Sequence, residues 1–106
     1  MTISDVGHFL ESHGLICSPE HRLLDLSSEL GEVCKEVLKS SNYGAAKPSV
    51  TPALIEEIGD LLFCVHALAI ECGLDPNETL RSTLRKYEAR AREKGHIGSD
   101  THDAGA

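Results

Sequence analysis

Two short acidic motifs hold the residues of this chain best suited to chemistry, Glu29-Leu-Gly-Glu32 and Glu57-Ile-Gly-Asp60. Each motif places two acids three positions apart, which puts both on one face of a helix. Carboxylates held on two rigid helices could bind a hard divalent cation such as Mg²⁺. Carboxylate-held metals in turn indicate phosphate chemistry.

One such motif alone is weak evidence, because glutamate favours helices and most helical acid pairs lie on a solvated face. Two observations strengthen the metal interpretation here. Both motifs lie inside long helical patterns, where the dipole of a helix N-terminus cannot explain the acids. Glu36 adds a third acid to the face of Glu29 and Glu32, with Lys35 as the expected compensating charge.

The rest of the chain predicts an all-α helical bundle of one short and three long helices, with no strand-like alternation. Capping residues, prolines and glycines mark the helix boundaries. The expected helices are Asp5 to His13 with Ser4 as its cap, Pro19 to Lys39, Pro52 to Cys72, and Pro76 to Lys94. Residues 1–95 should form one domain, and the small, polar segment 96–106 should be a disordered tail.

The two acid-bearing helices resemble each other, with Gly31 and Gly59 at matching positions. These glycines suggest that the two backbones approach closely. The third predicted helix is apolar nearly all round, because Phe63 and Ile70 lie opposite its main apolar stripe. We therefore expect a homo-oligomer, a homodimer or a homotetramer, with Phe63 and Ile70 at the contact between subunits.

Composition excludes several classes of partner. The formal net charge is −7 and no basic stripe runs along the chain, which argues against a nucleic-acid partner. No apolar run is long enough for a membrane helix, and Met1 to Leu10 lacks a signal-peptide pattern. The four cysteines lack CxxC spacing, so we expect buried, reduced thiols in a cytoplasmic protein and no zinc site.

Three segments together resemble the MazG-like nucleotide pyrophosphohydrolases, an all-α superfamily that acts on nucleoside triphosphates. They are Leu26-Ser-Ser-Glu-Leu-Gly-Glu-Val33, Glu56-Glu-Ile-Gly-Asp-Leu-Leu-Phe63 and Gly73-Leu-Asp-Pro-Asn-Glu-Thr-Leu80. The resemblance implies Mg²⁺-dependent cleavage of a ribo- or deoxynucleoside triphosphate to the monophosphate and pyrophosphate, with Mn²⁺ as a substitute. It also implies a role in clearing non-standard or excess nucleotides.

Carried onto this sequence, the resemblance makes Glu29, Glu32, Glu57 and Asp60 the metal ligands. Lys86 and Arg90, four positions apart on the last helix, would bind the phosphates. Two departures concern recognition of the base. The asparagine that many relatives carry near that lysine is missing, and the chain has no tryptophan. His8, Phe9 or Tyr43 could stack on a base instead.

In the expected mechanism Glu32 or Glu36 aligns the attacking water as general base, and no residue set supports a covalent intermediate. Two alternatives stay open. Phosphoribosyl-ATP pyrophosphohydrolase resembles the same superfamily and breaks the same type of bond in another substrate. A non-catalytic helical module that binds a nucleotide or a partner protein is the other alternative.

Overall fold

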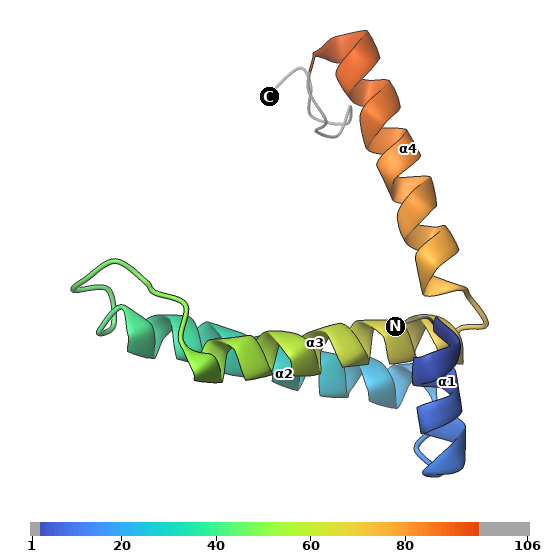
Figure 1. The fold of residues 1–106 in the computed structure, drawn as a ribbon, viewed down its shortest axis with the longest axis horizontal. Coiled ribbons are helices and arrows are strands. Elements are labelled where there is room, and N and C mark those ends of the chain that lie inside the picture. Colours follow the sequence, from blue (N-terminus) through green and yellow to red (C-terminus); the bar gives the residue numbers. More distant parts are fainter. Residues whose placement is uncertain (1–2, 96–106) are drawn as a thin grey trace. The chain divides into compact units, whose positions relative to one another are not determined.

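The computed structural model describes residues 3–95 and confirms the all-α fold. The helices are α1 (Ile3–Ser12), α2 (Pro19–Ser40), α3 (Pro52–Glu71) and α4 (Pro76–Lys94), and no strand occurs among these residues (Figure 1). The chain divides after Leu74 into two compact units, the first with α1 to α3 and the second with α4. The tail predicted for residues 96–106 lies outside the described part of the chain.

Capping side chains begin three of the four helices. Ser18 accepts a hydrogen bond from the N–H of His21, and Thr51 accepts one from Leu54. Asp75 accepts from Asn77 and Glu78, and a proline follows each of these caps. The cap predicted at Ser4 is wrong, because α1 begins at Ile3 and Ser4 lies within the helix. Gly95 ends α4 in the left-handed conformation, with a φ of 75°.

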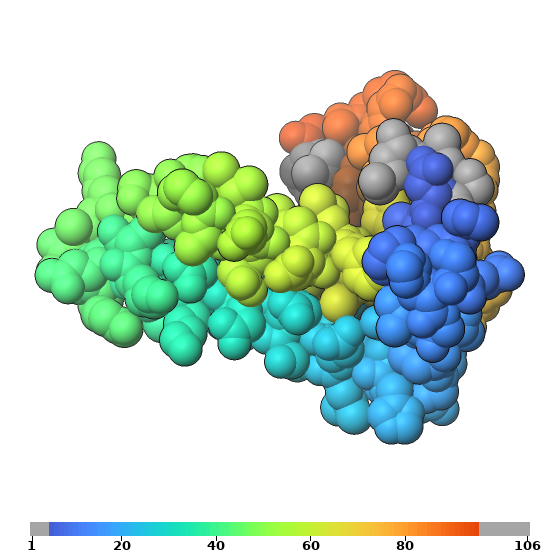
Figure 2. All heavy atoms as spheres, turned by 60° about the horizontal axis from the view of Figure 1, so that its bottom comes forward, coloured from blue at the N-terminus to red at the C-terminus, as the bar shows by residue number. Residues whose placement is uncertain are grey.

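In the first unit, α2 and α3 lie side by side along their lengths, and α1 packs on the C-terminal half of α3 (Figure 2). The small core between α1 and α3 contains Val6, Leu10 and Ala67, with Phe63 and Ile70 packed against it. Our expectation that Phe63 and Ile70 need another subunit is therefore wrong. The short first helix covers that side of α3 within the same chain.

Within the first unit, α1 and α2 leave a different side of α3 exposed. Ile55, Ile58, Leu62 and Val65 recur at helical spacing and keep 42–59% of their surface exposed. We call these four residues the outer stripe. Helical periodicity alone places three of them, Ile58, Leu62 and Val65, in the main apolar stripe, because it cannot tell which apolar side of α3 meets α2.

The structure corrects two further expectations. A Cβ added at Gly31 or Gly59 would meet nothing within 4 Å, so neither glycine is needed for the packing of α2 against α3. Only Cys64 among the cysteines is buried, whereas Cys34 and Cys72 are exposed. None of the helices in residues 3–95 combines the length and the apolar character needed to span a bilayer.

Candidate metal and substrate site

The antiparallel pairing of α2 and α3 brings acids from both motifs together. Glu29 comes from α2, and Glu57 and Asp60 come from α3. One carboxylate oxygen of each lies within 4.8 Å of the other two. Glu29 and Glu57 are half-buried and Asp60 is exposed, so the cluster opens to solvent. This geometry suits a single divalent cation, which bonds carboxylate oxygens at about 2.0–2.6 Å.

The charges in the cluster are not compensated locally. Within residues 3–95, no ion pair or hydrogen bond joins Glu29, Glu57 or Asp60 to a cationic side chain. Partial burial and the negative charges of Asp60, Asp25 and Glu32 raise the pKa of Glu29. Partial burial, Asp60, Glu29 and other nearby acids raise the pKa of Glu57. The folded chain therefore holds negative charge that a cation would stabilise.

The fourth expected ligand, Glu32, lies outside the group of converging oxygens but close to it. Its charge contributes to the raised pKa of both Glu29 and Glu57. Glu36 is turned toward a cation, because Lys39 Nζ lies 3.3 Å from its Oε2. Lys39, rather than the expected Lys35, therefore compensates the acids on this face of α2. Glu32 has no such pairing among the described residues.

Asp25 is a member of the acidic surroundings that the sequence interpretation missed. It lies one helical turn before Glu29, and its charge also raises the pKa of Glu29. The spacing of four residues would have indicated it, because such residues neighbour each other on a helix. The signal was hidden because Asp25 belongs to neither acidic motif.

An apolar pocket of about 220 Å³ lies between α1 and α3 in the first unit. Asp5, Val6, Phe9 and Phe63 line it. The rings of Phe9 and Phe63 meet edge to face, with their centroids 5.8 Å apart. Phe63 follows Asp60 by three positions in α3, so the pocket begins one helical turn from the acid cluster.

The basic residues expected to bind phosphate belong to the second unit. Lys86 Nζ and the Arg90 guanidinium carbon lie 5.2 Å and 5.9 Å from the centroid of the Tyr87 ring. Both cations therefore gather around one aromatic side chain in the second half of α4. Their role toward the acid cluster stays a prediction.

Comparison with known proteins identifies the class to which this fold and site belong. The chain is a member of the MazG nucleotide pyrophosphohydrolase domain family, whose sequence model matches residues 17–94. The match includes both acidic motifs and all of α2, α3 and α4. The resemblance recognised in the sequence is thereby confirmed.

A curated relative is the uncharacterized protein YpjD of Bacillus subtilis (strain 168). It is 29% identical over 92 residues, which cover 84% of this chain and 78% of the relative. No solved structure matched the chain.

Proposed function

We propose that this chain hydrolyses nucleoside triphosphates to monophosphate and pyrophosphate with Mg²⁺ as the cofactor. The observation that carries the proposal is the convergence of Glu29, Glu57 and Asp60 from two helices within 4.8 Å. Family membership supports a nucleotide pyrophosphohydrolase in particular. A role in removing non-standard or excess nucleotides is part of the same proposal.

The donor set fits a hard divalent cation. It consists of carboxylate oxygens, which Mg²⁺ and Mn²⁺ prefer, and contains no thiolate or imidazole. Glu29, Glu57 and Asp60 would hold the ion directly, and Glu32, whose charge acts on both Glu29 and Glu57, would be a further ligand. When bound, the ion would neutralise phosphate oxygens and lower the pKa of a coordinated water.

We assign the remaining roles to side chains other than the three converging acids. Glu32 is better placed than Glu36 to orient the attacking water, because the Glu36 carboxylate is already paired with Lys39. A general base needs a carboxylate that is ionised and not engaged elsewhere. We assign binding of the substrate phosphates to Lys86 and Arg90, whose cationic groups suit an anionic polyphosphate.

The pocket at Phe9 and Phe63 supports a place for the nucleobase. Its apolar lining and edge-to-face rings offer stacking surface close to the acids, and stacking of a base on an aromatic side chain contributes about 1–3 kcal/mol. Phe9→Ala should therefore raise KM for the nucleotide and leave the binding of Mn²⁺ alone unchanged. An unchanged KM would indicate that the base does not bind in this pocket.

The deciding experiment identifies the products. Phosphorus NMR should follow a panel of ribo- and deoxynucleoside triphosphates and phosphoribosyl-ATP with Mg²⁺, using Asp60→Asn as the inactive control. We expect a monophosphate and pyrophosphate in equal amounts. Orthophosphate as the first product would contradict the proposal, and turnover of phosphoribosyl-ATP alone would favour the alternative enzyme. Binding without any turnover would indicate a non-catalytic module.

We also propose that the working protein is a homo-oligomer. The support is the outer stripe, an apolar surface of α3 that α1 and α2 leave exposed within the first unit. Exposed apolar patches of this kind mark interaction surfaces. We propose that a second copy of this chain covers the outer stripe, because this requires no other protein.

A further inference from the structure

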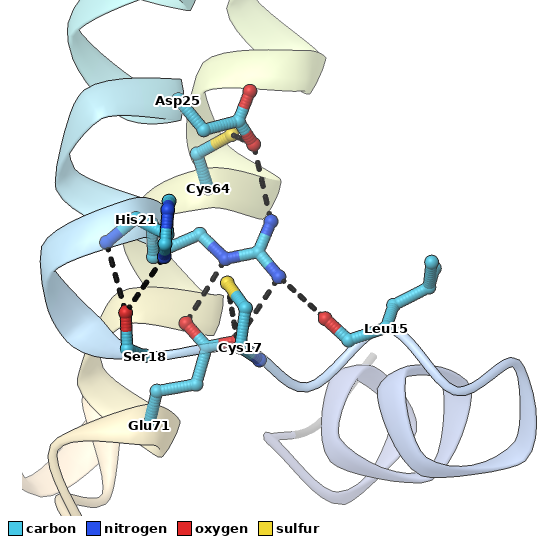
Figure 3. Close-up of polar contacts among 8 residues, drawn as sticks. Leu15, Cys17, Ser18, His21, Asp25, Cys64 and Glu71 are labelled. Carbon is cyan, nitrogen blue, oxygen red and sulfur yellow. Dashed lines mark hydrogen bonds and ion pairs between the residues drawn. The ribbon is translucent and has the colours of Figure 1, made fainter.

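Arg22 is the most heavily engaged side chain among the described residues, and the proposed chemistry does not use it. Its Nε donates to Glu71 Oε1 at 2.9 Å, and its Nη2 donates to Glu71 Oε2 at 3.0 Å (Figure 3). Nη2 also donates to the Leu15 carbonyl at 2.9 Å, and Nη1 donates to Asp25 at 3.1 Å. Arg22 thus joins the α1–α2 loop, α2 and the end of α3.

This pair lies in the interior, unlike the other ion pairs found in residues 3–95. The side chains of Arg22 and Glu71 are only 8% and 1% exposed. Glu71 Oε2 also accepts a hydrogen bond of 3.0 Å from the Cys17 N–H. A buried pair with both carboxylate oxygens bonded is strongly directional, because two parallel bonds fix the orientation of the side chains and separating them would leave desolvated charges without a partner.

The bonds of Arg22 and the acid cluster both depend on the same register of α2 against α3. Along α2 the order is Arg22, Asp25 and Glu29; the residues that meet them on α3 are Glu71, Cys64 and Asp60. Cys64 Sγ lies 3.4 Å from Asp25 Oδ2 and so marks the middle of this series. A slide of one residue would displace the helices by about 1.5 Å, enough to break the two-bond pair and to separate the acids.

We infer that Arg22 is a positioning residue: its fork to Glu71 fixes the register of α2 against α3 and thereby sets the spacing of Glu29 from Glu57 and Asp60. The inference rests on the proposed function in one respect, that these acids bind a divalent cation. The register itself is a property of the two helices and can be measured without a metal.

The test distinguishes an effect of Arg22 on the register of the helices from an effect on the stability of the fold. In Arg22→Met/Glu71→Met, two unbranched apolar side chains replace the buried pair, and such replacements are often neutral or stabilising. We expect the double variant to unfold at a denaturant concentration close to that of wild type, yet to bind Mn²⁺ about tenfold more weakly by titration calorimetry. Arg22→Lys keeps the charge but not the fork and should also bind Mn²⁺ more weakly.

Charge alone predicts the opposite result. Removing Arg22 and Glu71 together leaves the net charge unchanged, and it takes a cation away from Asp25 beside Glu29. On electrostatic grounds Mn²⁺ would then bind more tightly, so weaker binding reports a change of geometry. As a control, Arg92→Met removes an exposed pair with Glu88 and should leave the affinity unchanged. Wild-type affinity in the folded double variant would overturn the inference.

A second measurement stays informative if wild type binds no Mn²⁺, an outcome that would count against the proposed function instead. Cys34 in α2 and Cys72 at the end of α3 are exposed and can carry nitroxide labels in a Cys17→Ser background. Diluted with unlabelled protein, the pair reports the helix register through dipolar electron spin resonance. We expect a broadened or shifted distance distribution in the double variant. An unchanged distribution would overturn the inference.

Discussion

At the scale of single residues, the fold holds the carboxylates of the acid cluster close together, where their like charges repel each other. Glu29 and Glu57 have raised pKa values because partial burial and neighbouring carboxylates disfavour their ionised forms. A bound cation would relieve this repulsion, so metal binding and stability should be linked. The same residues therefore carry both the proposed function and a local cost to stability.

Asp60→Asn tests this link. The substitution removes one charge from the cluster, so the metal-free variant should be at least as stable as wild type. Mg²⁺ should raise the Tm of wild type but not that of the variant, as measured by differential scanning fluorimetry. Activity should fall by more than about 100-fold, the upper range for losing a residue that merely supports a metal ligand. Glu32→Gln should also abolish activity. Normal turnover in either variant would show that these acids form only a solvated face with no role in metal binding or catalysis.

At the scale of the helices, glycine lowers helix stability, and the packing of α2 against α3 gives no reason for Gly31 or Gly59. A Cβ at either position would meet open space. We expect Gly31→Ala and Gly59→Ala each to raise the free energy of unfolding by about 1 kcal/mol, as measured by urea denaturation without metal. Gly73→Ala is the matched control, and it should destabilise because Gly73 has a φ of +77°. A loss of stability at Gly31 or Gly59 would indicate a close contact outside the single chain.

The Glu71 ion pair predicts a pH dependence at the same scale. Burial would raise the pKa of Glu71, but hydrogen bonds from Arg22 and the Cys17 N–H, together with the Arg22 charge, outweigh it and lower the pKa. A lowered carboxyl pKa contributes stability above the unfolded value of about 4.5, and this stability is lost as the pH falls through the folded value. Below pH 4.5, wild type should therefore lose stability relative to Arg22→Met/Glu71→Met in urea unfolding. A difference in the free energy of unfolding between the two proteins that stays constant from pH 6 to pH 3 would contradict this prediction.

The helices also show which features a sequence can reveal. Ser18, Thr51 and Asp75 cap helices through local hydrogen bonds, and local chemistry is readable from neighbouring residues. Convergence of the two acidic motifs could be predicted because both lie inside helices of similar pattern. The Arg22–Glu71 pair could not, because it joins residues 49 positions apart. The side of α3 that meets α1 was likewise hidden, since several of its faces are apolar.

At the scale of the whole molecule, each of the two units has little buried core in its described residues. Among the described residues, the buried hydrophobic side chains are Val6, Leu10, Leu54, Cys64 and Ala67. The second unit also exposes an apolar row, Leu80, Leu84 and Tyr87, at 37–58%. A chain of this length that stands alone normally buries well over half of its unfolded surface. Both units therefore present apolar surface that an assembly could bury.

We therefore expect a homo-oligomer at micromolar concentration, as measured by size-exclusion chromatography with light scattering. Ile55→Glu places a charge in the outer stripe, where the side chain is 59% exposed in the single chain. The subunit should keep its helical circular dichroism, but the assembly should dissociate because the charge would be desolvated at the interface.

Phe63→Glu should instead disturb the packing of α1 on α3, since Phe63 lies against Val6 and Leu10. Glu56→Gln, an exposed neighbour outside the stripe, is the matched control and should leave the mass unchanged. A monomeric wild type would contradict the expectation, and so would an intact oligomer in Ile55→Glu.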